Sequence, residues 1–155
     1  MESWETKLAR WKINFFPAYR GTGAWVDYIA SDWHEIRVRL PLSWRTRNLV
    51  GTIFGGSLYG AIDPMYMIML MRLLGRDYIV WDKAACIQFK KPGKSTLYAA
   101  FKLSQEEIDD IRRQAQAQPS LERVYEVTLN DAAGVVHAVA QKTIYIRWKG
   151  NQRES

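Results

Sequence analysis

A chain of 155 residues with 48% hydrophobic residues lies within the size range of one domain and can bury a substantial core. Its net charge of +6 is a modest basic excess, and without a recognisable nucleic-acid-binding motif it predicts no nucleic-acid partner. The longest apolar stretch, Leu58 to Met71, is interrupted by Asp63 and Pro64 and is too short to cross a bilayer, so no integral membrane association is expected.

The single cysteine and the first residues bear on the compartment. Cys86 has no second cysteine to pair with, and its apolar neighbours favour a reduced, buried thiol. Residues 1–11 carry charges throughout and lack the apolar core of a secretory signal. Together these features favour a cytoplasmic protein.

Apolar residues at helical spacing predict an N-terminal helix over residues 3–16. Its apolar stripe consists of Trp4, Leu8, Trp11 and Phe15. Such a stripe can bind a membrane surface or pack against the domain's own core. Packing on the core is the more common arrangement and is the one we expect.

Two strands and a long apolar helix follow. The residues from Trp25 to Ala30 favour a strand, and those from Glu35 to Leu40 alternate strictly between polar and apolar, so the two segments predict a hairpin. Ser57 to Leu74 then reads as a helix that ends at Gly75. Its apolar residues face all directions, so other elements must wrap around it.

The rest of the chain can form that wrapping. Strands are predicted over residues 78–90, 97–103, 121–129 and 135–148. A capping-box pattern at Ser104 and Glu107 opens a surface helix over 104–117, and residues 150–155 read as a frayed tail. The order of elements predicts one α+β domain, with an antiparallel sheet of about six strands curled around a central apolar helix.

Asp63 lies inside that apolar helix and has two interpretations. An unpaired buried carboxylate is costly, so its presence suggests a function. Alternatively, Asp63 and Pro64 could simply form the start of a helix. Gly55 and Gly56 favour the functional interpretation, because glycines before a helix let its free N–H groups approach a ligand closely, although they are also compatible with an ordinary turn.

These residues share a pattern with a known superfamily. Asn48, Gly51, Thr52, Gly55, Gly56 and Asp63 have the spacing N-x-x-G-T-x-x-G-G-x6-D. The pattern resembles the signature of hotdog-fold acyl-CoA thioesterases of the phenylacetate-pathway type. The chain looks most similar to a subgroup long described as a domain of unknown function, which has an extra helix before its last two strands.

The resemblance implies a hotdog fold and a role for each matched residue. Asp63 matches the catalytic carboxylate, which acts as a general base on water or as a nucleophile. Gly56 matches the glycine whose backbone N–H polarises the thioester carbonyl, and Asn48 matches a polar positioning residue. In such folds the helix start and the acid commonly come from different subunits, which implies a homodimer or a tetramer.

The chain also departs from the family pattern. Phe54 stands where the family usually has His, and Asp82 occupies a strand position that often holds Ser or Thr. Asp82 could be catalytic or could lie near Asp63 and raise its pKa, but pairing with Lys83 at an exposed strand start is the expected arrangement. Pro64, directly after the acid, predicts a kink.

Coenzyme A requires cations for its phosphates. Candidates for substrate binding are Lys90, Lys91 and Lys94 around the Pro92-Gly93 turn, with Arg45 and Arg47 before Asn48. A charged hairpin tip is also compatible with plain solvated surface. His34 and His137 lack partners at metal-ligand spacing, so no metal is expected, and no cofactor other than the coenzyme A of the substrate.

The leading hypothesis from sequence is hydrolysis of fatty acyl-CoA or acyl-carrier thioesters by a homo-oligomer. The alternative is a non-catalytic protein that binds an acyl ligand, for which Phe54 in place of His is the argument. A basic scaffold without a small ligand is the third possibility.

Overall fold

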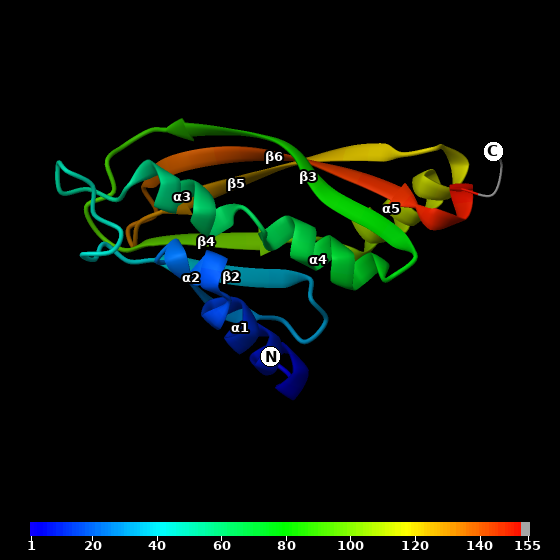
Figure 1. The fold of residues 1–155 in the computed structure, drawn as a ribbon, viewed down its shortest axis with the longest axis horizontal. Coiled ribbons are helices and arrows are strands. Elements are labelled where there is room, and N and C mark those ends of the chain that lie inside the picture. The colour runs from blue at the N-terminus through cyan, green and yellow to red at the C-terminus, as the bar shows by residue number, and fades with distance from the viewer. Residues whose placement is uncertain (153–155) are drawn as a thin grey trace.

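Six strands form one antiparallel sheet in the computed structural model, which describes residues 1–152 (Figure 1). The strands are β1 (Trp25–Ile29), β2 (Glu35–Leu40), β3 (Tyr78–Phe89), β4 (Leu97–Lys102), β5 (Leu121–Asn130) and β6 (Val136–Trp148). Their order across the sheet is β1-β2-β4-β5-β6-β3, so β1 and β3 are the two edges. The predicted hairpin and the four later strands are therefore confirmed.

The helices are α1 (Trp4–Phe15), α2 (Pro17–Gly21), α3 (Gly55–Ile62), α4 (Met65–Leu74) and α5 (Gln105–Ala117), and a 3₁₀ helix covers Lys149–Gln152. Figure 1 shows α3 and α4 end to end, lying between β2 and β3 where the sheet curls around them. Within residues 1–152, no helix combines the length and apolar character that a bilayer crossing needs.

The central helix differs from the prediction of one continuous segment. It begins at Gly55 and is interrupted at Asp63 and Pro64, which separate α3 from α4. The Asp63 N–H still donates to the Tyr59 carbonyl at 3.0 Å, but Pro64 has no N–H to continue the ladder. The helix ends at Gly75, whose φ of 89° suits glycine, as predicted.

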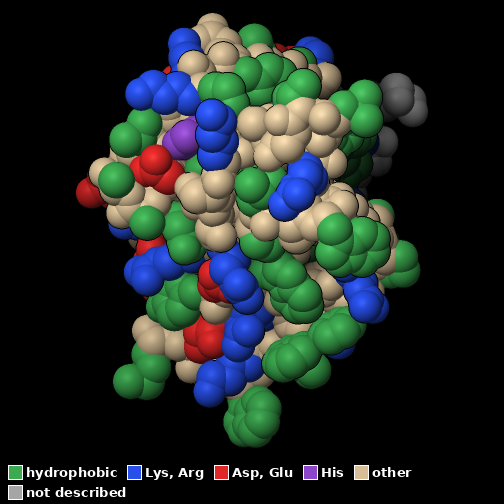
Figure 2. Space-filling view, turned by 90° about the vertical axis from the view of Figure 1, so that its left-hand side faces the viewer, with side chains coloured by type: hydrophobic (Ala, Val, Ile, Leu, Met, Phe, Trp, Pro, Cys, Tyr) green, Lys and Arg blue, Asp and Glu red, His purple; other side chains and the backbone are tan. Residues whose placement is uncertain are grey.

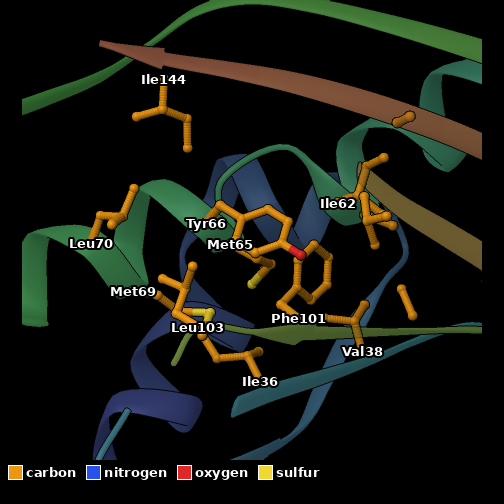
Figure 3. Close-up of a cluster of buried hydrophobic side chains, with 14 of the residues drawn as sticks. Ile36, Val38, Ile62, Met65, Tyr66, Met69, Leu70, Phe101, Leu103 and Ile144 are labelled. Carbon is orange, nitrogen blue, oxygen red and sulfur yellow. The ribbon is translucent and has the colours of Figure 1, made fainter. Parts of the chain in front are cut away.

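The core lies between this helix and the sheet. Met65, Met69 and Leu70 of α4 are completely buried, and Tyr66 packs edge-on against Phe101 of β4 with ring centroids 5.2 Å apart (Figure 3). Further buried side chains come from β2 and β6, among them Ile36, Val38 and Ile144. The helix is thus wrapped by the sheet, as its all-round apolar character predicts.

The C-terminal half contains the predicted surface helix. Ser104 caps α5 by accepting the Glu107 N–H at 3.1 Å, and the helix buries Ile108, Ile111 and Ala115. The frayed tail predicted over 150–155 is wrong for residues 150–152, because Asn151 donates to the carbonyls of Ala115 and Gln118 at 2.8 and 2.9 Å. Residues 153–155 lie outside the described residues.

The orientation of α1 overturns the prediction that its apolar stripe packs on the core. Trp4, Leu8, Trp11 and Phe15 are all exposed. The side facing the domain instead carries Asn14, whose amide accepts the Val26 N–H at 2.7 Å and donates to the Val26 carbonyl at 2.9 Å. Because β1 is an edge strand with free backbone groups, it needs a polar partner, and α1 turns its polar side inward to provide one.

Cys86 is exposed, so the prediction of a buried thiol is also wrong. It lies on β3, the other edge of the sheet, where most side chains are partly or fully exposed. Apolar neighbours in sequence indicate a strand, but burial depends on what covers that strand.

Candidate active site

A polar cluster forms at the break between α3 and α4. The Asp63 Oδ1 atom accepts hydrogen bonds from the Tyr59 hydroxyl and from the Lys142 ammonium, each at 2.6 Å. Lys142 also donates to the Tyr59 oxygen at 2.9 Å. Asp63 and Tyr59 are one helical turn apart on α3, so the helix itself brings them together.

Lys142 comes from the middle of β6 and has a completely buried side chain. Burial alone would lower the pKa of this lysine, but its bonds to Asp63 and Tyr59 and its contact with Asp82 raise the pKa to about 12. Lys142 is therefore protonated at neutral pH. A buried cation of this kind needs hydrogen-bond acceptors close to it, and Asp63 and Tyr59 provide them.

Asp82 of β3 contacts the same lysine, with its Oδ1 atom 3.1 Å from Lys142 Nζ. This Oδ1 atom is buried and lacks a well-aligned hydrogen bond, so the contact is mainly electrostatic. Burial, and to a lesser degree the charge of Asp63, raise the pKa of Asp82. A break in the β3–β6 register after Asp82 marks this position as irregular.

The expected pairing of Asp82 with Lys83 is wrong, because Lys83 pairs with Glu122 of β5 instead. Two successive strand residues point to opposite faces of a sheet, so the side chains of Asp82 and Lys83 cannot pair with each other. Asp82 and Asp63 instead contact the same Lys142 ammonium. This corresponds to the alternative considered from the sequence, in which Asp82 lies close to Asp63.

The Tyr59 phenol remains protonated in this cluster. Burial is the main reason that its pKa is raised, and the hydrogen bond to Asp63 adds to the effect. Tyr59 can therefore donate to Asp63 while it accepts from Lys142. The cluster holds one carboxylate oxygen of Asp63 with two donors.

A largely apolar pocket of about 540 Å³ lies beside Asp63. It is formed where α1 and α2 face the break in the central helix, and its walls include Ile13, Phe16, Tyr19 and Met67. The volume is within the range of pockets that hold small molecules. An apolar ligand in it would be in contact with Asp63.

The predicted residues at the start of α3 form a second site. A groove of about 380 Å³ is bordered by Asn48, Gly55, Lys90 and Lys91, among others. Gly55 and Gly56 are the first residues of α3, so their N–H groups have no acceptor within the helix. A side chain at Gly56 would come within 2.4 Å of the exposed Phe54 ring, so this ring would have to move to admit it.

Asn48 has a structural task in its loop. Its side-chain oxygen accepts the N–H groups of Val50 and Thr52 at 3.1 and 3.0 Å, and its amide donates to the Thr52 hydroxyl at 2.9 Å. These bonds fix the turn before α3. Arg47 and the exposed Phe54 border a neighbouring hollow, and Lys94 is exposed outside the groove.

The two sites are separated within one chain. Asp63 lies seven residues after Gly56 along the helix, a distance of about 10 Å at 1.5 Å per residue. The structure thus brings Asp63 together with Asp82, and Asn48 together with Gly55, Lys90 and Lys91. It does not bring these two sets together in one protomer.

The histidines have backbone and side-chain partners. The His34 ring bonds to the Leu103 carbonyl at 2.6 Å, and the His137 ring contacts the Pro92 carbonyl and Asp131, both at 3.1 Å. Over residues 1–152, no group of three or more His, Cys, Asp or Glu side chains is placed to hold a metal ion.

Lys142 and Tyr59 were missed by the reasoning from sequence. A signal for Lys142 was present, because inward positions of β6 alternate as Ala138, Ala140, Lys142, Ile144 and Ile146. A single lysine among apolar residues at that spacing predicts a buried cation that needs a carboxylate partner.

Proteins of known structure share this fold. A probable thioesterase of unknown function from Pseudomonas aeruginosa is 20% identical and aligns over 92% of this chain and 95% of its own, with a TM-score of 0.81. A protein of unknown function from Chlorobaculum tepidum is 15% identical over 92% of this chain and 93% of its own, with a TM-score of 0.74.

A thioesterase from Haemophilus influenzae is 12% identical over 92% of this chain and 91% of its own, with a TM-score of 0.66. No curated protein matches the sequence. The family pattern described as domain of unknown function DUF4442 matches residues 6–146. The chain therefore belongs to the DUF4442 family and has the hotdog fold.

Proposed function

We propose that this protein hydrolyses fatty acyl thioesters of coenzyme A, with Asp63 as the general base or nucleophile. The observation that carries the proposal is Asp63, a wall residue of the apolar pocket, whose carboxylate is held at one oxygen by Tyr59 and Lys142. A fixed carboxylate next to a site for an acyl chain is what thioester hydrolysis requires.

The geometry leaves Asp63 able to react. Among residues 1–152 only its Oδ1 atom takes part in the cluster, and the side chain is 43% exposed. The other oxygen can take a proton from water as that water attacks the thioester carbon. The carbon–sulfur bond then breaks, and the proton passes to the leaving thiolate to give a carboxylic acid and a thiol.

The developing oxyanion needs donors that Asp63 cannot reach in its own chain. The N–H groups at the start of α3 are suited to this task, because helix N-termini stabilise negative charge, and removing one such donor typically costs about 3 kcal/mol of activation free energy. They lie about 10 Å from Asp63 along the helix. We therefore propose that each active site combines Asp63 of one subunit with Gly56 of another.

The edge strand β3 is the surface that supports a dimer. Ala85 and Phe89 lie opposite Lys142 and Ala138 of β6, and therefore on the helix side of the sheet, yet both are exposed. An uncovered edge of 12 residues is a template for pairing with a second strand. Two β3 strands related by a two-fold axis would continue the sheet and cover these residues.

The groove at the start of α3 supports binding of the coenzyme. Lys90 and Lys91 provide cations beside Gly55. Arg47, which precedes Asn48 in the sequence, and Lys94, which follows Lys91, are also exposed. Cations together with helix N–H groups suit the phosphates of coenzyme A. The acyl chain would then extend toward the apolar pocket of the partner.

A panel of acyl-CoAs of increasing chain length, assayed by release of free thiol, tests the proposal. We expect turnover of at least one fatty acyl-CoA, and a raised melting temperature with an unreactive acyl-CoA analogue. Absence of turnover across the panel, at protein concentrations that the analogue visibly stabilises, would overturn the proposed hydrolysis.

That second outcome would support the alternative function, a non-catalytic acyl-CoA binder. Phe54, which replaces the histidine of the resembling thioesterases, is the observation in its favour. Its ring is 57% exposed beside Gly56 and offers no proton donor to a thioester carbonyl.

A further inference from the structure

The outward side of α1 is an aromatic surface that no other described element covers. This α1 aromatic face consists of Trp4, Leu8, Trp11 and Phe15, which are between 48% and 88% exposed. We propose that it docks the protein onto the surface of a membrane that contains anionic phospholipids.

The face is a fixed part of the domain. The opposite side of α1 is held by the Asn14 bonds to β1, and Glu2 accepts the Ile29 N–H at 3.0 Å while pairing with Arg10 at 2.9 Å. These polar contacts satisfy the edge strand. Because these contacts hold the polar side of α1 against the domain, the aromatic side of the helix faces outward.

The aromatic rings are ordered against one another. Trp11 and Phe15 stack with centroids 5.3 Å apart and planes within 7°, and Trp25 meets Phe15 edge-on at 6.3 Å. Stacked rings at the surface lose little conformational freedom when they bind. Tryptophan also suits the boundary between lipid tails and headgroups, where one end of the ring is apolar and the other is wet.

Positive charge surrounds this face. At 100° per residue, Lys7 and Lys12 fall on opposite flanks of the apolar stripe, and the Arg20 guanidinium lies 5.5 Å from the Phe15 ring centre. The acidic residues of this segment, Glu2 and Glu5, are paired with Arg10 and Arg72. Figure 2 shows apolar side chains beside basic and acidic ones along the lower part of the molecule, where Figure 1 shows α1.

This charge pattern favours lipid over a second copy of the chain. In a symmetric contact between two α1 aromatic faces, lysines on both flanks would meet the lysines of the other copy, which is unfavourable. An anionic bilayer attracts each of them, by an amount that corresponds to about fivefold in affinity per cation. The face thus has the two components of interfacial binding, buried apolar area and basic flanks.

The face and the apolar pocket are two sides of one helix. Ile13 and Phe16 form part of the pocket wall beside Asp63, while Trp4 and Trp11 point outward. A bilayer bound to α1 would lie about one helix diameter, or 10 Å, from that pocket.

Sedimentation with lipid vesicles tests the proposal. The full chain is mixed with vesicles of phosphatidylcholine alone, or of phosphatidylcholine with about 30% phosphatidylglycerol. We expect binding to the anionic vesicles that is at least about tenfold tighter than to neutral ones and that weakens with salt. Equal or absent binding to both would overturn the proposal.

Matched variants assign the binding to this face. Replacing Trp4 and Leu8 together by Gln should weaken binding to anionic vesicles about tenfold, whereas Val124→Gln, at an equally exposed apolar site on β5, should leave it unchanged. Lys7→Gln should cost about fivefold and reduce the salt dependence. Membrane docking would be contradicted if the Trp4 and Leu8 changes left vesicle binding unaffected. It would also be contradicted if the unmodified chain bound no vesicles and the same changes reduced the mass of the oligomer.

Discussion

One lysine holds two carboxylates and a phenol in the candidate active site. Lys142 contacts Asp63, Asp82 and Tyr59 from a completely buried position on β6. A buried ammonium of this kind is stable only because its partners offset the loss of water. Lys142 therefore connects the stability of the domain to the position of Asp63, the proposed catalytic carboxylate.

Replacing Lys142 by Met tests this connection. Without the ammonium, Asp63 and Asp82 are left as neighbouring carboxylates with no cation, so we expect the free energy of unfolding to fall by about 2–4 kcal/mol. Urea denaturation measures the loss. Adding Asp82→Asn should restore part of it by removing one unpaired charge, and a double variant no more stable than Lys142→Met would contradict the proposed coupling.

The raised pKa of Asp82 predicts a dependence of stability on pH. In the interval from the ordinary value of 3.8 up to the raised pKa, the folded protein binds more protons than the unfolded chain, so stability falls as pH rises. Asn cannot titrate. Asp82→Asn should therefore raise the melting temperature by a few degrees more at pH 7 than at pH 4, as scanning calorimetry at both values would show. A larger gain at pH 4 would be the wrong sign.

At the scale of the elements, the break between α3 and α4 gives the acid its position. Asp63 and Pro64 both keep helical dihedral angles, with φ of −49° and −86°, so the chain continues in nearly the same direction. The missing N–H of Pro64 interrupts the ladder directly after the acid. Pro64 therefore interrupts the helix within the candidate site, directly after Asp63.

Pro64→Ala tests what the break does. Alanine permits a continuous helix, so we expect the unfolding free energy to change by less than about 1 kcal/mol while turnover falls about tenfold, because Asp63 moves relative to its two donors. Circular dichroism, denaturation and kinetics on the same sample measure all three. Ser104→Ala is a suitable control, since losing the α5 cap should cost about 1 kcal/mol of stability and leave turnover unchanged.

Local patterns predicted most elements because periodicity, caps and turns are properties of adjacent residues. The alternation from Glu35 to Leu40 and the Ser104 cap are examples. Which face an element buries depends on its distant partners. The α1 stripe and Cys86 were misplaced for this reason, since β1 and β3 are sheet edges and a linear pattern does not show which strands will be edges.

The same distinction applies to the candidate site. The family resemblance located Asp63, and the sequence raised Asp82 as a second acid that could lie near it. The alternation in β6 carries a signal for a buried Lys142, but it does not show that Asp63 is the partner, because the contact joins residues 79 positions apart. Asn48 was expected to be a positioning residue for the substrate, but the hydrogen bonds of its side chain lie within its own loop.

At the scale of the whole molecule, the proposed active site needs two subunits. Gly56 and Asp63 mark opposite ends of α3, and β3 presents an uncovered edge along which a second copy can pair. The exposed loop tip at Leu49 and Val50 is a further apolar surface that a partner could cover. The oligomer is thus a functional requirement of the proposed mechanism.

Complementation between two inactive variants tests the shared site. Asp63→Asn removes the acid, and Gly56→Pro removes the N–H donor in the first turn of α3, where that N–H has no acceptor within the helix; the exposed Phe54 ring would have to move to admit the proline. Refolding the two together in equal amounts should restore about a quarter of the original turnover, since half of the dimers are mixed and each has one intact site. Turnover no greater than the sum of the separate variants would show that each site lies within one chain.

The most direct test of the central claim is the turnover number of Asp63→Asn with the best acyl-CoA of the panel. Asparagine has the same shape and still accepts hydrogen bonds from Tyr59 and Lys142, but it cannot take a proton from water or attack the thioester. Asp27→Asn, which alters an exposed carboxylate paired with Arg39 at the far edge of the sheet, is the matched control. We predict that kcat falls about a hundredfold or more in Asp63→Asn and stays unchanged in Asp27→Asn. A folded Asp63→Asn protein with kcat within about twofold of the unmodified chain would contradict the assignment of Asp63 as the catalytic base or nucleophile.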